Sequence, residues 1–264
     1  MLLETLLATN LTAAALLAVS VRKNLEHKAR RKQRGLFSPW PVKRIAPHEL
    51  LPELAPGATG PSRETEILSI ANYRVPGAIS DLETWILCNL AKRARLLFEF
   101  GTATGKTTYL LARNAPADAR IVTLTLDPRT VASYRAAAGD ESAARVSALE
   151  ESVFETFMYT GSPVAGKITQ HYGDSKAFDE SPYLARCDFV FVDGAHAYSY
   201  VVSDSRKALR MVRPGGVVLW HDYSGPRGAH GVFRALNELS TEIELLHLAG
   251  TTLVFHRKPH APRP

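Results

Sequence analysis

The sequence has 264 residues, which is enough for one large α/β domain with a sizeable core and an appendage. Apolar residues make up 45% and charged residues 22%, a mixture that excludes a largely disordered chain. The net charge of +6 comes from one short segment, because residues 22–34 hold seven Lys or Arg side chains against one acid, Glu26. The rest of the chain is balanced, so we expect no nucleic-acid partner for the main domain. Two cysteines make no disulfide framework and indicate a reducing compartment for that domain.

The N-terminus carries an uncharged stretch rich in Leu and Ala at residues 5–21. Its length lies at the short end of what spans a bilayer, roughly 17–25 residues. The only charge before it is Glu4 and the basic cluster follows it, which favours an uncleaved anchor over a cleaved signal peptide. We therefore expect residues 1–34 to be a hydrophobic helix with a basic flank that contacts a membrane, with the body of the chain on the cytoplasmic face. The alternative is an Ala-rich helix that packs on the domain or on a partner, in an otherwise cytoplasmic protein.

Residues 35–63 contain six prolines and are predicted to form a linker with one short helix around residues 48–54. The folded domain is expected at residues 64–258 and a short tail at 259–264. Its first helix should cover residues 80–95, with Ser80 as the N-cap and one apolar face.

From residue 96 onward, predicted strands and helices alternate. Strands are expected at 96–100, 121–126, 167–172, 188–192 and 217–220, and a closing hairpin at 245–249 and 252–256. Helices are expected at 106–114, 129–138, 148–158, 198–212 and 231–240. This alternation predicts a doubly wound, Rossmann-like parallel sheet with helices on both faces.

A Gly-rich turn follows the first of these strands, in the series FEFGTATGKTT. Gly101 and Gly105 would let the backbone turn tightly where a helix begins. Three residues, rather than the four of a P-loop, separate Gly101 from Gly105-Lys106-Thr107, and the spacing also breaks the dinucleotide fingerprint. A tight turn without a ligand is the structural alternative.

Acids follow the next two strands of the predicted sheet. Asp127 ends the series TLTLDP, where a carboxylate suits the two hydroxyls of a ribose. Asp174, in Gly173-Asp174-Ser175, could accept a hydrogen bond from an adenine amino group, or could serve as an N-cap. Together with the Gly-rich turn, these acids indicate an adenosine site.

Two further clusters follow the fourth and fifth of these strands. Asp193 and His196 lie in VDGAHAY, and His221 and Asp222 lie in WHDY. Ligands of open α/β sheets bind beyond such strand ends, so these side chains are candidates for metal ligation and general base chemistry.

The series FEFGTATGKTT, TLTLDP, GDS, FVDGAHAY and RPGGVVLWHDY resembles the class I methyltransferases. It is most similar to bacterial small-molecule O-methyltransferases of the cephalosporin and macrocin type, over about residues 64–256. The resemblance implies a seven-stranded, mostly parallel sheet with an antiparallel C-terminal strand, and S-adenosylmethionine as the cofactor. It also implies cofactor-binding residues: Glu99, Gly101, Thr104, Gly105 and Thr107 around the methionine part, Asp127 at the ribose, Asp174 and Ser175 at the adenine, and Asp193 beside the site.

Catechol-type relatives place metal ligands where Asp193, His221 and Asp222 stand, and a catalytic lysine where this chain has His196. Mg²⁺ prefers oxygen ligands, so a histidine at 221 would favour a transition metal or leave Asp193 and Asp222 to bind alone. Metal-independent catalysis with His196 as base and Asp193 beside it stays open.

We therefore expect O-methylation of a small-molecule, sugar or lipid-linked hydroxyl, with an envelope-associated acceptor favoured by the anchor. A membrane-tethered S-adenosylmethionine-binding module without catalysis and a nucleotide-dependent oxidoreductase on the same fold are the alternatives. A homodimer is left open.

Overall fold

The computed structural model describes residues 17–23, 40–75, 79–129 and 134–260. The chain divides into two units, Met1–Trp40 and Pro41–Pro264. In the first unit, residues 17–23 are helical and the apolar side chains of Leu17, Val19 and Val21 are exposed. The rest of the predicted segment 1–34 lies outside the described residues. A membrane-crossing helix, long and apolar enough for a bilayer, is not found in the described part of the chain.

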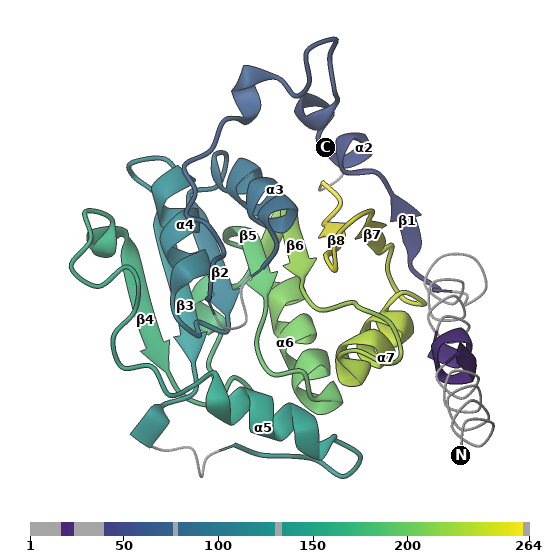
Figure 1. Cartoon of the computed structure of the whole chain (residues 1–264). Coiled ribbons are helices and arrows are strands. Elements are labelled where there is room, and N and C mark those ends of the chain that lie inside the picture. The colour runs from purple at the N-terminus through teal and green to yellow at the C-terminus, as the bar shows by residue number, and fades with distance from the viewer. Residues whose placement is uncertain (1–16, 24–39, 76–78, 130–133, 261–264) are drawn as a thin grey trace, which may run out of the picture. The chain divides into compact units, whose positions relative to one another are not determined.

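A mixed sheet forms the centre of the second unit (Figure 1). Eight strands are found among the described residues: β1 Lys43–Ile45, β2 Leu96–Phe100, β3 Arg120–Thr125, β4 Ile168–Tyr172, β5 Cys187–Val192, β6 Val212–Trp220, β7 Leu246–Leu248 and β8 Val254–Arg257. Their spatial order is β1-β7-β8-β6-β5-β2-β3-β4. Strand β8 is antiparallel to both of its neighbours, and the other pairs are parallel. The prediction of a mostly parallel, doubly wound sheet with an antiparallel C-terminal strand is confirmed.

The sheet has one strand more than the seven predicted. The additional strand β1 comes from the Pro-rich segment and pairs in parallel with β7 at the sheet edge. Ile45, Leu51 and Leu54 of the same segment are buried in the main apolar cluster. The short helix expected here is split into α2 (Pro47–Leu50) and a 3₁₀ turn at Pro52–Leu54. Much of the segment expected to be a linker is therefore packed against the domain, because its few apolar residues reach the core.

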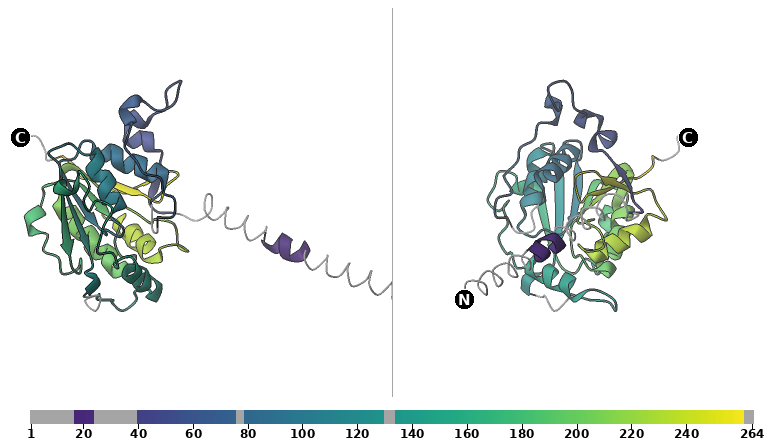
Figure 2. Two further views of the ribbon diagram at one scale, coloured as in Figure 1. Left: turned by 60° about the vertical axis from the view of Figure 1, so that its left-hand side comes forward. Right: turned by 45° about the vertical axis from the view of Figure 1, so that its right-hand side comes forward.

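Helices cover both faces of the sheet (Figures 1 and 2). The remaining helices are α3 Asp81–Ala91, α4 Lys106–Asn114, α5 Ser142–Glu150, α6 Tyr198–Met211 and α7 His230–Leu239. Helices α3 and α4 contact each other and bury their apolar side chains in one cluster with β2, β3, β5 and β6. Helices α6 and α7 contact each other, and α6 packs on β5 and β6. Ser80 caps α3 as predicted, since its Oγ accepts a hydrogen bond from the Glu83 backbone N–H at 3.3 Å.

Two predicted helices differ from the structure. Residues 134–138 are not helical, and residues 130–133 lie outside the described part. Helix α5 begins at Ser142 and ends at Glu150, whereas the apolar spacing predicted a helix at 148–158.

The strand order reverses between β2 and β5, because β2 continues to β3 on one side and β5 lies on the other. Clefts of doubly wound sheets form at such a switch point, outside the carboxyl ends of the strands. Gly101 and Asp193 directly follow β2 and β5, so both lie at this position.

Candidate active site

The turn after β2 is shaped by a close backbone approach. Gly101 has φ +93°, and a Cβ at this position would lie 2.0 Å from the carbonyl oxygen of Asp193. Gly105 is the N-cap of α4 with φ +74°, and a Cβ there would lie 2.8 Å from Phe157 Cβ. Both glycines are therefore required by packing. Only Gly101 also faces the hollow described below.

Glu99 lies below this turn and is buried, with 1% of its surface exposed. Its Oε2 accepts hydrogen bonds from the hydroxyls of Thr108 and, at 2.7 Å, of Thr123. Thr123 is linked to Thr102 at 2.8 Å, and Thr102 accepts from Gln170 Nε2 at 3.3 Å. Burial raises the pKa of Glu99 to about 8, although the two threonine hydroxyls lower it. Glu99 therefore supports the turn through the buried threonines and is not among the residues that line the hollow described below, so its predicted place around the methionine part stays a prediction.

A hollow of about 550 Å³ opens at the switch point. We call it the main hollow. Its walls come from the turn after β2, the ends of β3 and β5, the segment after β4, and helices α5 and α6. Its lining residues include Gly101, Thr125, Glu151, Asp174, Ser175 and Asp193. Four of the predicted cofactor residues therefore line it, namely Gly101, Asp174, Ser175 and Asp193. The other predicted residues of the Gly-rich turn, Thr104, Gly105 and Thr107, are not among the residues that line it.

Asp127 is likewise not among the residues that line the main hollow. Its carboxylate accepts hydrogen bonds from the guanidinium of Arg129, at 3.1 Å to Nε and 3.2 Å to Nη2. The same carboxylate accepts from the Arg129 backbone N–H at 2.9 Å. Hydrogen bonding to Arg129 lowers the pKa of Asp127. The residues at the end of β3 that line the hollow are Leu124, Thr125 and Leu126, of which Thr125 is the polar one. The ribose role of Asp127 stays a prediction, and in this arrangement its oxygens are paired with Arg129.

Asp174 offers an acceptor to the main hollow. Its residue is 7% exposed, and Oδ1 accepts from the Lys176 backbone N–H at 2.9 Å. Oδ2 is buried and has no hydrogen-bond partner among the described residues. Asp204, on α6, lines the same hollow and is fully buried, which raises the pKa of its carboxyl group to about 7. Tyr200 interacts with the Asp174 carboxylate, whose two oxygens keep the capacity to accept from a ligand donor.

Two aromatic rings form another part of this wall. Tyr134 and Tyr200 both line the main hollow, and their rings stack with centroids 4.7 Å apart. The Tyr200 hydroxyl accepts from the Arg135 backbone N–H at 2.8 Å. Lys176 Nζ lies 3.9 Å from the centroid of the Tyr200 ring. A flat apolar wall beside a free carboxylate oxygen suits a heteroaromatic ring that carries an amino group.

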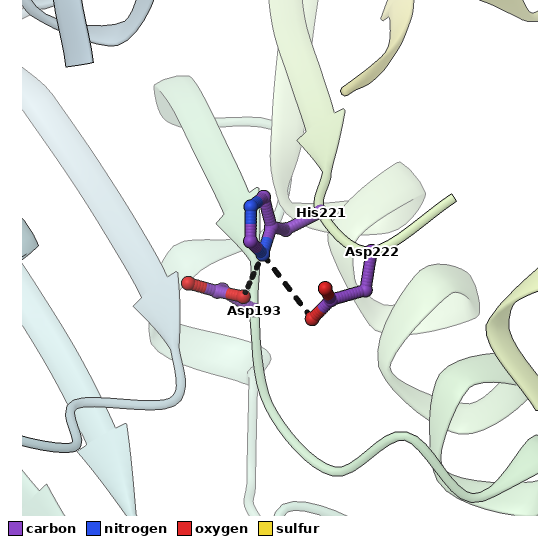
Figure 3. Close-up of side chains that lie close together, drawn as sticks. All are labelled: Asp193, His221 and Asp222. Carbon is purple, nitrogen blue, oxygen red and sulfur yellow. Dashed lines mark ion pairs between the residues drawn. The ribbon is translucent and has the colours of Figure 1, made fainter. Parts of the chain in front are cut away.

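Asp193, His221 and Asp222 meet at the ends of β5 and β6 (Figure 3). His221 Nδ1 points between the two carboxylates, 2.9 Å from Asp193 Oδ1 and 3.2 Å from Asp222 Oδ2. One donor atom of each residue lies within 4.8 Å of the others, so the three could hold a metal ion. The other ring nitrogen, Nε2, lies 3.5 Å from Oε2 of Glu83. Burial alone would lower the pKa of His221, but the surrounding carboxylates raise it well above its usual range. The structure therefore brings the three predicted metal ligands together and adds Glu83.

His196 lies on the other side of Asp222. Its Nε2 is 2.8 Å from Asp222 Oδ2. Burial lowers the pKa of His196, but the hydrogen bond and charge of Asp222 outweigh burial and raise it to about 9. A second, smaller hollow of about 230 Å³ is lined by His196, His221 and Asp222 and shares Asp193, Gly194 and Ala195 with the main hollow. The predicted base therefore lies beside the predicted adenosine site.

Sequence reasoning missed two acids at this site. Glu151 lines the main hollow, and the charges of Asp193 and Asp222 add to burial in raising its pKa. Glu83 is 3% exposed; burial raises its pKa, but His221 and the backbone N–H groups of Thr252 and Ser80 lower it to about 2. Glu83 could have been noticed as the fourth residue of the Ser80 capping box, a pattern that leaves its carboxylate pointing back across the helix N-terminus.

Comparison with known proteins identifies a methyltransferase domain in the chain. Residues 98–223 match a family described as a methyltransferase domain, a range that contains the Gly-rich turn and both His-Asp clusters. No curated protein shows a sequence match to the chain. The methyltransferase PaMTH1 of Podospora anserina, solved with S-adenosylhomocysteine, has a similar structure with a TM-score of 0.50. The two sequences are 15% identical, over 75% of this chain and 92% of that one.

Two solved O-methyltransferases are also similar. TomG of Streptomyces achromogenes, involved in tomaymycin synthesis and solved with S-adenosylmethionine, is 24% identical over 69% of this chain and 82% of its own, with a TM-score of 0.47. An O-methyltransferase of Bacillus cereus, solved with S-adenosylhomocysteine, is 17% identical over 70% and 84%, with a TM-score of 0.45.

Residues 98–223 of the chain therefore match a methyltransferase domain, and the sheet has the Rossmann-like fold of such domains.

Proposed function

We propose that the chain transfers the methyl group of S-adenosylmethionine to a hydroxyl oxygen of a small-molecule, sugar or lipid-linked acceptor. The observation that carries this proposal is the wall of Asp193, Gly194 and Ala195 shared by the two hollows. This wall separates the cofactor side from a histidine that can take a hydroxyl proton. Methyl transfer to oxygen needs both halves next to each other.

The main hollow fits the cofactor. It is a concave site at the switch point, and the Asp174 carboxylate on its wall can accept from the adenine amino group. Gly101 brings the backbone of the turn close to Asp193, and Thr125 and Ser175 add hydroxyls to the walls. When bound, S-adenosylmethionine supplies a methyl group on a positively charged sulfur. The chain's own residues supply position and proton removal.

His196 and Asp222 form the proposed proton-accepting pair. Asp222 holds the imidazole through the 2.8 Å contact to Nε2 and fixes the direction of the ring. Because its pKa is about 9, His196 is mostly protonated near pH 7. Its neutral form, which would take the proton of the acceptor hydroxyl as the oxygen attacks, increases as the pH rises toward 9. Asp193 lies on the shared wall and contacts His221, which holds its carboxylate in place.

A divalent cation is a second arrangement that the donor set favours. Asp193 Oδ1, His221 Nδ1 and Asp222 Oδ2 converge, and the mixture of nitrogen and oxygen suits a transition metal better than Mg²⁺. Such a cation would lower the pKa of an acceptor hydroxyl. Dialysis against EDTA followed by addition of Mg²⁺, Mn²⁺ or Zn²⁺ tests this arrangement, and full activity after complete metal removal would rule it out.

The test of the main proposal uses methyl-tritiated S-adenosylmethionine and a cell extract as the source of acceptor. We expect the purified chain to label a product, and His196→Gln to lower the initial rate about 100-fold, which is within the usual range for a general base. His48→Gln, an exposed histidine of α2, is the matched control and should keep the wild-type rate. S-adenosylhomocysteine should bind all three proteins equally in calorimetry.

Two results would refute the proposal. Cofactor binding without any labelled product would favour a non-catalytic binding module. Tighter binding of NAD than of S-adenosylmethionine would favour an oxidoreductase.

A further inference from the structure

Glu83 connects three parts of the molecule that are far apart in sequence. It belongs to the first turn of α3, between β1 and β2 in the chain, and its residue is 3% exposed. Oε2 accepts from the Ser80 backbone N–H at 2.7 Å and lies 3.5 Å from His221 Nε2. Oε1 accepts from Thr252, at 2.6 Å from the backbone N–H and 2.9 Å from Oγ1. One carboxylate therefore joins α3, the end of β6 and the β7–β8 turn.

Thr252 carries this connection on to Asp222. The Thr252 Oγ1 that donates to Glu83 accepts from the Asp222 backbone N–H at 3.2 Å. The Thr252 carbonyl accepts from the Tyr223 backbone N–H at 3.0 Å. Asp222 has φ +63°, in the left-handed region that residues with a Cβ rarely adopt. Thr252 thus binds the two consecutive N–H groups at a turn that costs backbone energy.

Carboxylates face the His221 ring from both sides. Asp193 and Asp222 face Nδ1, and Glu83 faces the buried Nε2 at 3.5 Å, an ion-pair contact longer than the hydrogen bonds of this site. A carboxylate opposite one ring nitrogen fixes the orientation of an imidazole and decides what the other nitrogen presents. Glu83 therefore acts on the side of His221 that faces away from Asp193 and Asp222.

We infer that Glu83 is a positioning residue for methyl transfer, which holds the His221 ring directly and the Asp222 backbone through Thr252. This inference rests on the proposed function of His196, Asp193 and Asp222. It adds a residue of α3, Glu83, that lines neither of the two hollows but contacts His221, which lines the smaller one.

A purely local role for Glu83 is the competing explanation, because Glu83 also completes the capping box of α3. Helix α2 offers a matched control. Glu49 occupies the same N3 position there and accepts from the Ala46 backbone N–H at 2.7 Å. Glu49→Gln alters a cap without touching the active site, whereas Glu83→Gln alters a cap and the contacts to His221 and Thr252.

The first experiment compares Glu83→Gln with Glu49→Gln in the full chain. We expect Glu83→Gln to lower the rate of label transfer about 10- to 100-fold, as loss of a partner behind a site residue usually does, with S-adenosylhomocysteine affinity within about twofold of wild type. Glu49→Gln should keep the wild-type rate. Histidine-selective ¹⁵N NMR, with His221→Gln for assignment, should show the His221 Nε2 resonance displaced in Glu83→Gln only.

The second experiment tests the path through Thr252. Thr252→Val removes the hydroxyl at nearly constant shape and should lower the rate about tenfold or more, whereas Thr252→Ser keeps the hydroxyl and should restore it. These variants keep the inference testable if Glu83→Gln fails to fold.

Equal rates and an unmoved His221 resonance in Glu83→Gln would overturn the inference, as would equal losses in Glu83→Gln and Glu49→Gln. Failure of the wild type to bind cofactor or transfer label would refute the proposed function instead. The His221 resonance would then still decide whether Glu83 holds the ring.

Discussion

Glu99 is a buried carboxyl group between two threonine hydroxyls, and its protonation should be visible in the stability of the fold. Burial raises its pKa to about 8, whereas the unfolded chain has a value near 4.5. Between these values the folded state keeps its proton and the unfolded state releases it, so stability falls as pH rises from about 4.5 to about 8. At about 1.36 kcal/mol per pKa unit, the upper limit of this loss is about 5 kcal/mol.

Glu99→Gln should remove this contribution while keeping the shape of the side chain. Urea unfolding at pH 5 and pH 8 measures it, as the difference between variant and wild type at each pH. We expect the variant to gain stability relative to wild type at pH 8. Parallel pH dependences of the two proteins would contradict the assignment.

We expect Asp174 to contribute more than Asp127 to the affinity for the cofactor. The free Oδ2 of Asp174 faces the main hollow, so Asp174→Asn puts an N–H₂ group where a ligand donor should be accepted. Lost hydrogen bonds of this kind cost about 1–3 kcal/mol, which predicts at least a fivefold weaker affinity for S-adenosylhomocysteine. Asp127→Asn should change the affinity less than about twofold, because its carboxylate is bound to Arg129. Calorimetry measures both affinities. A larger loss of affinity in Asp127→Asn than in Asp174→Asn would support the ribose role of Asp127 that was predicted from the sequence.

The residues show where sequence reasoning ends. The chemical types at the strand ends could be predicted, since Asp193, His221 and Asp222 follow buried apolar runs and Asp174 follows the partly exposed strand β4. Which of Thr125 and Asp127 lines the main hollow could not be predicted, because it depends on where β3 ends and on the nearby Arg129. Glu83 could not be assigned either, because its partners His221 and Thr252 lie far along the chain.

Among the elements, the turn between β2 and α4 leaves no room for a side chain at Gly101. A Cβ at Gly101 would overlap the Asp193 carbonyl at 2.0 Å, and φ is +93°. Gly101→Ala should therefore cost about 3 kcal/mol or more and abolish cofactor binding, because the two strand ends would have to separate. Gly166→Ala, in open space, is the control and should change stability by less than about 1 kcal/mol. Thermal unfolding with and without S-adenosylhomocysteine measures both effects, and a native-like Gly101→Ala would contradict the close approach.

Strand β1 tests whether the Pro-rich segment belongs to the fold. Ile45 is 7% exposed and joins the main apolar cluster, so Ile45→Ala should lower the free energy of unfolding by about 2–4 kcal/mol. Lys43→Ala, on the same strand with an exposed side chain, should stay within about 0.5 kcal/mol of wild type. Urea unfolding compares the two variants. Equally small changes in the free energy of unfolding would show that residues 43–45 do not contribute to the core and act as a linker.

The elements were predictable where their patterns are long. The apolar runs of β2, β3, β5 and β6 and the Ser80 cap of α3 lie close to their predicted positions. Strand β1 has three residues, two of them basic, and takes its conformation from pairing with β7. Helix α5 has two buried alanines and a weak apolar face, so its bounds depend on packing against α6 rather than on periodicity.

For the whole molecule, the sequence of the N-terminal segment predicts attachment to a membrane. Residues 5–21 are uncharged, the basic cluster follows them, and the apolar side chains of residues 17, 19 and 21 are exposed. We predict that the full chain sediments with membranes and that a chain lacking residues 1–34 does not, because the apolar stretch needs a lipid environment. Cofactor affinity should be the same for both chains, since the main hollow is built within residues 100–204.

The manner of membrane attachment can be separated from its presence. Replacing Lys28, Arg30, Arg31 and Lys32 with Gln removes the charges that would contact anionic head groups but keeps the apolar stretch. If the stretch inserts into the bilayer, this variant stays in the pellet after a carbonate wash. If attachment is electrostatic, the variant and salt-washed wild type both appear in the supernatant. Release of the untreated full chain into the supernatant would contradict the anchor and favour a helix that packs on protein.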